Sequence, residues 1–316
     1  MTILHGIKAS MEEREAYLQI LSTGLDGRCL EKFIIFNGSG GNSKGTIDDL
    51  MLIALGNYAI IGNNGLLFES SHSGTNPEKA NLHKKRFVVF REPPEKHKFE
   101  NSVIKEFTGG GSFSARGLYE SNASKELNLT MIVECNKRPL FREEPGQAEV
   151  RRIIDFYFRS TFVTDDSLIK HEQFIFKASG LYKTKTFQET HKFALLKILM
   201  DAHKRYTAAG CVFKLPASVT ERTNDYLELS CDIIQWFKDN YDIADKKLYT
   251  SIKEIYDVFK ASEYYSNIPK ADKLKYTRNY FTEYLQTNPF FKTYYSERYD
   301  NVRHVLRGCI LKDTID

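Results

Sequence analysis

The chain has 316 residues, of which 45 are Lys or Arg and 41 are Asp or Glu, so its formal net charge is +4 with histidine neutral. So small an excess does not indicate a polyanionic partner, and binding of nucleic acid has to be argued from local motifs. No run approaches the roughly 18 consecutive apolar residues of a membrane span, and the acidic residues at positions 12, 13 and 15 are atypical of a signal peptide. We therefore expect an intracellular protein without a membrane partner, built from about two domains.

The predicted elements change in kind along the chain. A helix is expected over residues 10–23. Short apolar runs follow, at residues 33–36, 86–90, 129–133 and 153–156. Their continuous apolarity is typical of strands buried on both faces of a parallel sheet, with helices between them. Past residue 185 the strand patterns stop and helical patterns take over.

This change divides the chain into three expected segments. Residues 1–28 are a helical lead-in, residues 29–240 an α/β domain with a mostly parallel sheet, and residues 241–316 a small, mainly helical domain with a winged helix as one option. The last segment holds more than half of the chain's 18 tyrosines, interleaved with Lys and Arg. A tyrosine-rich core and a helix that presents stacking and phosphate-binding groups to DNA both explain this composition.

A glycine-rich loop follows the first expected strand. It consists of Gly38, Ser39, Gly40, Gly41, Asn42, Ser43, Lys44, Gly45 and Thr46, and a helix begins near its end. This is a context for phosphate binding, because backbone N–H groups can surround an anion, a lysine can reach the terminal phosphates and the helix N-terminus adds partial positive charge. A flexible surface loop is the alternative for this segment taken alone.

The loop departs from the pattern GxxxxGK[ST] at two positions. Ser43 stands where a glycine precedes the lysine, and Gly45 stands where a hydroxyl would bind magnesium. Thr46 comes one place late, and one residue turns a side chain by roughly 100° on a helix. Thr46 therefore replaces the missing hydroxyl only if the loop is wound differently.

Polar side chains follow or precede the other expected strands. Glu92 ends the second strand and is a candidate for polarising the attacking water or holding magnesium, and Asn136 ends the third and offers a donor and an acceptor near a γ-phosphate. Arg151 and Arg152 precede the fourth strand, where an arginine could stabilise transition-state charge in a neighbouring subunit. A solvated strand end, an Asn turn and a salt bridge are the alternatives for these residues taken singly.

The order of these motifs resembles the superfamily 3 helicase core. More narrowly, it resembles the helicase part of the poxvirus-type primase-helicases of nucleocytoplasmic large DNA viruses, with phage and plasmid relatives. The resemblance covers residues 10–240 and rests on the segments 86–93, 104–116, 134–139 and 151–154. It implies an AAA+-like P-loop ATPase that uses ATP and Mg²⁺, forms a hexameric ring around DNA and unwinds a duplex during replication.

The resemblance also implies a role for each motif residue. Lys44 is then the phosphate lysine, Glu92 the catalytic acid and Asn136 the sensor. Arg152, or else Arg151, is the finger that acts on the next subunit. Glu92 is then a magnesium ligand, and Thr46 is a second one if its hydroxyl can reach the ion.

The block from residue 105 to residue 116 is similar to a family motif associated with the DNA-facing part of the ring. Lys105, Arg116 and Lys125 are therefore expected to contact single-stranded or forked DNA, because six copies of a few basic residues suffice to line a channel. Ordinary solvated surface charge is the alternative for these three residues.

The primase half that commonly precedes this core is missing from the sequence. We therefore expect a split gene product, a fragment, or a subunit that works with a separately encoded primase, in the host cytoplasm or the virion. The leading hypothesis is an ATP-dependent DNA helicase acting in viral DNA replication. The exchange at Ser43 and Gly45 motivates an alternative, a weakly hydrolysing ring subunit or DNA-binding scaffold, and a small-molecule kinase is a third hypothesis.

Overall fold

The computed structural model describes residues 2–8, 10–68, 76–110, 112–115, 123–243, 245–268, 270–274 and 276–312. The chain divides into two compact units, Met1–Ser230 and Cys231–Asp316. The second unit begins at residue 231 and not at residue 241, because Trp236 and Phe237 of α9 (Asp232–Asn240) pack into its core.

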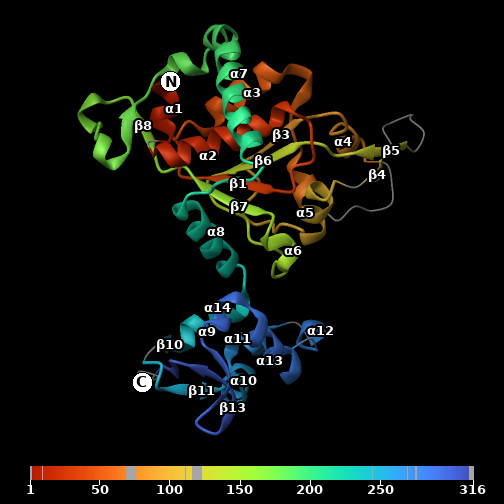
Figure 1. Cartoon of the computed structure of the whole chain (residues 1–316), viewed down its shortest axis with the longest axis vertical. Coiled ribbons are helices and arrows are strands. Elements are labelled where there is room, and N and C mark those ends of the chain that lie inside the picture. Colours follow the sequence, from red (N-terminus) through yellow and green to blue (C-terminus); the bar gives the residue numbers. More distant parts are fainter. Residues whose placement is uncertain are drawn as a thin grey trace. The chain divides into compact units, whose positions relative to one another are not determined.

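A five-stranded parallel sheet forms the centre of the first unit (Figure 1). Its order is β2-β3-β6-β1-β7, with bounds β1 (Phe33–Asn37), β2 (Ala59–Ile61), β3 (Phe87–Arg91), β6 (Thr130–Cys135) and β7 (Ile153–Tyr157). The expected parallel sheet is confirmed, and the four predicted strands are its four buried members. The edge strand β2 was not predicted, because it is short and partly exposed.

Helices cover both faces of this sheet. On one face, α2 (Met11–Ser22), α3 (Lys44–Leu55) and α7 (Lys185–Ala208) share an apolar core with the strands. On the other face, α5 (Asn101–Thr108) packs into a second core with Phe99 and Phe141. Since both faces are buried, the strands hold the loops at their carboxyl ends in fixed positions.

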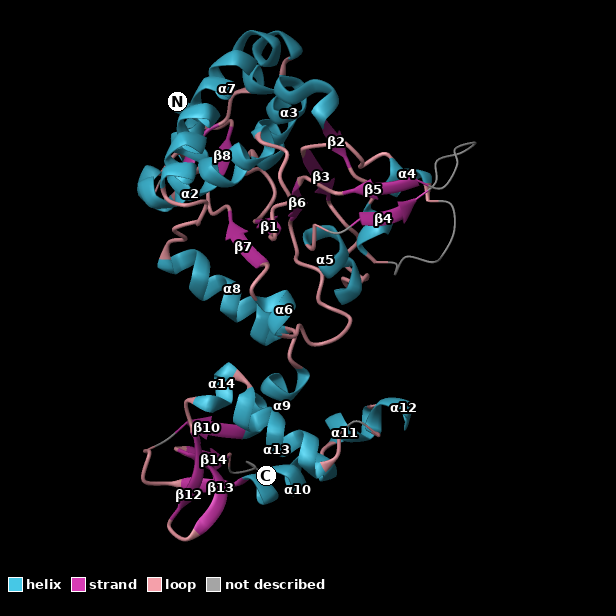
Figure 2. Ribbon diagram, turned by 45° about the vertical axis from the view of Figure 1, so that its right-hand side comes forward, coloured by secondary structure: helices cyan, strands magenta, loops and turns pink. Residues whose placement is uncertain are grey.

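Smaller elements surround the sheet. They are α1 (Thr2–Ile7), α4 (Pro77–Ala80), α6 (Gln147–Val150), α8 (Ala217–Leu229), β4 (Ser112–Ala115), β5 (Ala123–Glu126), β8 (Thr161–Val163) and β9 (Ile175–Lys177). The pair β4 and β5 is an antiparallel insertion between β3 and β6, and Figure 2 shows it to one side of the sheet near α4. In the part of the chain that the structure describes, no helix is long and apolar enough to cross a membrane.

The second unit combines helices with two small sheets. Its elements after α9 are β10 (Tyr241–Ile243), β11 (Tyr249–Ser251), α10 (Ile252–Ala261), α11 (Glu263–Asn267), α12 (Lys270–Lys273), α13 (Arg278–Thr287), α14 (Pro289–Lys292), β12 (Tyr295–Tyr299), β13 (Val302–Arg307) and β14 (Cys309–Leu311). The expected helical region is confirmed. Its described residues also contain five short strands that were not predicted, because most of them carry polar residues. A strand, helices and a closing hairpin in the sheet β11-β13-β12 make a winged-helix arrangement.

Lys8 is buried against the carboxyl end of β7. Its ammonium donates to the Tyr157 carbonyl and lies over the rings of Phe156 and Phe158, 4.1 and 4.3 Å from their centroids. Burial lowers the pKa of Lys8 to about 7, and the partner Glu13 offsets this only in part. The lysine is therefore held where its charged form is poorly solvated.

The free energy of unfolding of the first unit should consequently increase as the pH rises above 7. The unfolded chain keeps the Lys8 proton up to the ordinary lysine pKa of 10.5, whereas the folded chain releases it above about 7, so unfolding takes up a proton between these values. Between pH 7 and pH 9, the free energy of unfolding should increase by about 2 kcal/mol less in Lys8→Met than in the unaltered protein. Urea unfolding followed by circular dichroism tests this, because the single tryptophan reports on the other unit. Equal pH slopes in Lys8→Met and in the exposed control Lys204→Met would contradict the prediction.

Candidate functional site

The glycine-rich loop leaves β1 at the carboxyl edge of the sheet and leads directly into α3. A Cβ on Gly38 would lie 2.4 Å from the Phe158 carbonyl oxygen, so only glycine fits there. Ser43 has φ 61° and ψ 18°, a left-handed conformation that costs a non-glycine residue about 1 kcal/mol. The backbone thus adopts at Ser43 a conformation for which glycine is the ordinary residue.

The tip of this loop offers unpaired amide groups. Ser39, Gly40 and Gly41 are exposed, and among the described residues none of their backbone N–H groups donates a hydrogen bond. Asn42 braces the loop from inside, because its amide donates to the Ser39 carbonyl at 2.6 Å and its oxygen accepts from the Lys44 N–H at 3.2 Å. This arrangement can bind an anion through backbone donors next to a helix N-terminus.

Lys44 is the first residue of α3 and points back into the loop. Its ammonium donates to the Gly38 carbonyl at 3.0 Å and to the Asn136 side-chain oxygen at 3.3 Å. Burial lowers the pKa of Lys44, whereas the nearby carboxylates of Glu134 and Glu92 raise it. The ammonium therefore joins the loop to the tip of the neighbouring strand.

Glu92 and Asn136 lie together at the same edge of the sheet. Glu92 follows β3 with φ 45°, and its carboxylate accepts a hydrogen bond from the Asn136 backbone N–H at 3.3 Å. Both residues are exposed. The structure thus links three predicted residues by hydrogen bonds: Lys44 donates to the Asn136 side chain, and the Asn136 backbone N–H donates to Glu92. All three lie beside the glycine-rich loop, at the carboxyl edge of the sheet. Their chemical roles stay predictions.

The position after Lys44 faces an acid. A Cβ on Gly45 would lie 3.4 Å from the Glu134 Oε1 atom, and Glu134 itself is largely buried in β6. Thr46, one residue further along α3, is also buried, and its backbone N–H bonds to the Ser43 carbonyl. The role of Thr46 as a magnesium ligand stays a prediction.

Two further acids and one arginine surround Glu134. Arg91 is the residue of β3 that pairs with Glu134, and its Nε atom lies 3.7 Å from Glu134 Oε2. Its Nη2 atom lies 2.8 Å from Asp49 Oδ1. Asp48 is completely buried, and its carboxyl lies against that of Glu134. Burial, and then the Glu134 charge, raise the pKa of Asp48 well above its usual range.

A polar cluster behind the loop was missed by sequence reasoning. Asp155 of β7 is fully buried and accepts hydrogen bonds from Asn37 and Arg138. Arg222 of α8 lies 3.4 Å from Asp155 and donates to the Asn37 side chain at 3.0 Å. Burial raises the pKa of Asp155 to about 6, although the two arginines act against this. Their positions are far apart in sequence, so no local motif marks them.

The two candidate finger arginines lie at the opposite edge of the sheet. They precede β7, whose five residues separate them from the loop by roughly 16 Å. Arg151 is exposed, 3.7 Å from Glu31, whereas Arg152 is buried and donates to the Ala148 carbonyl. Of the two, Arg151 is the exposed arginine in this chain, and the role of either as a finger stays a prediction.

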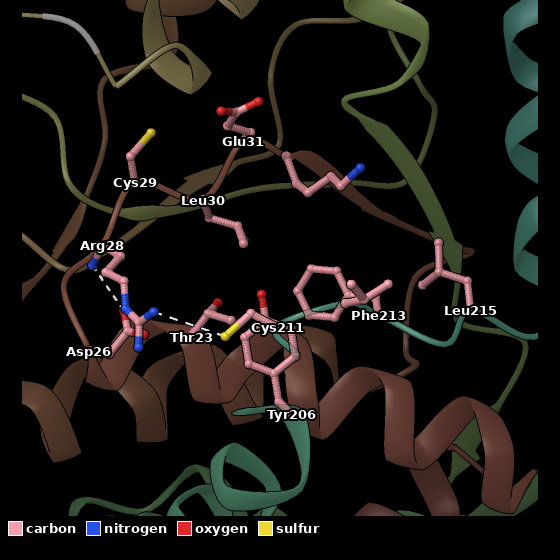
Figure 3. Close-up of a pocket in the computed structure, with 12 residues that line it drawn as sticks. Thr23, Asp26, Arg28, Cys29, Leu30, Glu31, Tyr206, Cys211, Phe213 and Leu215 are labelled. Carbon is pink, nitrogen blue, oxygen red and sulfur yellow. Dashed lines mark hydrogen bonds and ion pairs between the residues drawn. The ribbon is translucent and has the colours of Figure 1, made fainter. Parts of the chain in front are cut away.

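A pocket of about 430 Å³ lies beside this edge, before β1. Figure 3 shows Arg28 between Asp26 and Cys211, with the rings of Tyr206 and Phe213 on the other side of Cys211. The pocket contains none of the predicted site residues, although its residue Lys32 donates to the Arg151 carbonyl at 2.6 Å. It is thus separate from the glycine-rich loop.

The expected DNA-contacting residues have different positions. Lys105 is on α5 and pairs with the buried Glu149 at 2.9 Å, so its charge is already partly matched within the fold. Lys125 is on β5 of the antiparallel insertion. Arg116 lies outside the described residues.

Comparison of the sequence with known proteins finds viral relatives. The chain is 28% identical over 304 residues to the protein of Acanthamoeba polyphaga mimivirus named "Putative helicase L207/L206", which covers 90% of this chain and 30% of the relative. It is 28% identical over 217 residues to "Primase D5" of Fowlpox virus, covering 65% of this chain and 27% of the relative. The chain therefore spans less than a third of either relative. No family model matches the chain.

Solved structures share the fold. The apo C-terminal region of NrS-1 superposes with a TM-score of 0.52 at 14% identity, over 97% of this chain and 74% of that one. A further form of the same region gives a TM-score of 0.50 at 12% identity. The expected α/β fold with a mostly parallel sheet is confirmed by this likeness. The expected resemblance to viral primase-helicases is confirmed by the similarity to the two viral proteins.

Proposed function

We propose that this chain, a homologue of viral helicase and primase-helicase proteins, is the ATPase motor of an ATP-dependent DNA helicase acting in viral DNA replication. The observation that carries the proposal is that Lys44, Asn136 and Glu92 are joined by hydrogen bonds beside the glycine-rich loop, whose tip has unpaired backbone N–H groups. Three separate strand ends meet there, which is where nucleotides bind in parallel α/β sheets.

Each of these residues has a task in the proposed hydrolysis of ATP. The amides of residues 39–41 and the ammonium of Lys44 bind the phosphates, and Lys44 stabilises the charge that develops on the γ-phosphoryl oxygens. The Glu92 carboxylate orients the attacking water and accepts its proton, and Asn136 holds Glu92 through its backbone N–H. Magnesium, when bound, neutralises the phosphate charge, and the carboxylates near Lys44 fit a hard cation that prefers oxygen ligands.

The proposed motor is a ring of identical subunits, with six as the expected number. Arg151 supports this, because it is exposed at the edge of the sheet remote from the loop of its own chain and so could serve only the site of a neighbour. An isolated subunit would lack this arginine and would stabilise the transition state only through Lys44 and magnesium. A separately encoded primase as a partner is part of the proposal, and its motivation is the name of the Fowlpox relative.

DNA would bind at two places. The first is the insertion β4–β5 with Lys125, together with Lys105 and Arg116. The second is the winged-helix unit, where Arg298 of β12 and Arg303 of β13 are directly opposite each other and both exposed. Like charges in this arrangement destabilise a hairpin, and a DNA phosphate between them would offset the repulsion.

Gly45 supports a second candidate function, a ring subunit or DNA-binding scaffold that hydrolyses ATP weakly. The loop lacks the hydroxyl that usually binds magnesium, so binding could persist without efficient turnover. Creation of ATPase activity by Ser43→Gly with Gly45→Ser, in a chain otherwise inactive, would favour this candidate.

An ATPase assay with and without single-stranded DNA tests the proposal, on protein whose assembly state is measured by chromatography. We expect hydrolysis by an oligomer, stimulated by DNA, and strand separation on a forked substrate. Nucleotide binding without hydrolysis would favour the scaffold. Transfer of the γ-phosphoryl group from ATP to a small acceptor by a monomer, with release of ADP, would favour a kinase.

A further inference from the structure

The position that normally supplies a magnesium-binding hydroxyl is occupied by a glycine that faces a carboxylate. The Cβ direction of Gly45 leads to Glu134, with 3.4 Å to Oε1 and 3.7 Å to Oε2. A hydroxyl at position 45 would extend from that Cβ into the space now bordered by the Glu134 carboxylate. An oxygen ligand is therefore present close to the usual place, and it comes from a different element.

Strand alternation explains how Glu134 reaches this place. Successive side chains of a strand point to opposite faces, and Ile132 belongs to the core shared with α3. Glu134 continues the same face two residues later, at the end of β6 nearest the loop. It is paired with Phe36 of β1 on one side and Arg91 of β3 on the other.

A second observation at this place is Asp48. Its side chain is fully buried, no N–H or hydroxyl group of the described residues donates to its oxygens, and its hydrogen-bonding neighbour is the Glu134 carboxyl. The Asp48 carboxyl lies against that of Glu134, one helical turn after Lys44. Buried carboxyl oxygens without donors are costly unless a cation or a proton is close.

Thr46, the other possible source of a ligand, fits less well. It is buried in the first turn of α3 and follows Gly45 by one residue, so its side chain is turned by roughly 100° from the direction of Glu134. The basic residue on β3, Arg91, supplies no oxygen. Three carboxylates, those of Glu134, Glu92 and Asp48, lie near Lys44, and the Asn136 side-chain oxygen already accepts from Lys44 at 3.3 Å.

We propose that Glu134 replaces the missing hydroxyl of position 45 and, with Glu92, holds the divalent cation that accompanies the nucleotide, while Asp48 supports Glu134 from behind. This inference rests on the proposed function of the loop. Divalent magnesium is ordinarily bound by one or two carboxylates plus substrate phosphates, often through water, which this arrangement can provide. Arg91 of β3, itself paired with Asp49 of α3, then orients the Glu134 carboxylate.

Binding of Mn²⁺ in the presence of ADP, measured by electron paramagnetic resonance on the full chain, tests the inference without turnover. Glu134→Gln should weaken Mn²⁺ binding by about 10-fold to 100-fold, while ADP binding in EDTA remains. The matched control Glu12→Gln changes an exposed glutamate of α2 and should leave Mn²⁺ affinity as it is. Thr46→Val should do the same.

A rescue variant guards against a merely structural effect. Gly45→Ser places a hydroxyl in the usual position, where the space beside Glu134 accepts a Cβ, and should restore Mn²⁺ binding in the Glu134→Gln background. Unchanged Mn²⁺ affinity in Glu134→Gln, or a loss in Thr46→Val instead, would overturn the inference. Failure of the unaltered chain to bind ADP even in EDTA would overturn the proposed function itself.

Discussion

Arg151→Ala should lower ATP hydrolysis by about 10³-fold, because an arginine supplied to a neighbouring site stabilises charge on the transferring phosphoryl group. The residue is exposed and lies at the sheet edge opposite the glycine-rich loop, so its effect requires an assembled oligomer. Steady-state hydrolysis at several protein concentrations measures it. Nucleotide binding should change little, since this arginine acts chiefly in the transition state.

Mixing two inactive variants distinguishes action on a neighbour from a general defect. A subunit with Arg151→Ala keeps its own loop, and a subunit with Lys44→Ala keeps its own arginine. Mixed rings should therefore regain activity that neither variant has alone. The control Arg142→Ala, an exposed arginine paired with Glu100, should remain active. Absence of complementation, with both variants correctly assembled, would contradict the assignment of Arg151.

Lys44→Ala should lower ATP hydrolysis by at least about 10²-fold, as removal of one preorganised donor to developing charge typically does. It should also weaken nucleotide binding, because the ammonium is held between the Gly38 carbonyl and Asn136 at the outlet of the loop. The change removes a buried cation without removing core packing, so the thermal midpoint should fall little or rise. Hydrolysis and nucleotide titration by fluorescence anisotropy measure the two effects.

Lys204→Ala is the matched control, since Lys204 is an exposed lysine of α7. Full activity is expected there. If Lys44→Ala hydrolysed ATP at the rate of this control, the loop would not be the catalytic site and the motor proposal would fail.

Much of the fold was predictable because buried parallel strands have a distinctive composition. The runs at residues 33–36, 86–90, 129–133 and 153–156 are apolar on both faces, and the helices that cover them explain why. The meeting of Lys44, Asn136 and Glu92 was predictable for a related reason, since the carboxyl ends of parallel strands share one edge. The insertion β4–β5 and the five strands of the second unit were not predicted, because they are short and largely polar.

Other parts of the site depend on contacts between distant residues. Asn37 and Asp155 are separated by 118 positions, and Arg222 and Asn37 by 185, so their cluster has no local signature. Arg151 is exposed and Arg152 is buried because of the turn that follows α6. The sequence shows only two consecutive arginines, so it cannot indicate which of them is exposed.

The amino-acid sequence alone determined the class of sheet, the order of its motifs and the presence of a glycine-rich loop before a helix, because apolar runs, glycines and a lysine at fixed spacing act locally. Tertiary structure decided which oxygen faces Gly45 and which arginine faces outward. The reason is the register of the strands. Glu134 lies beside the loop because β6 is paired so that Glu134 is opposite Phe36 of β1 and Arg91 of β3. A shift of one residue would turn that carboxylate to the other face of the sheet.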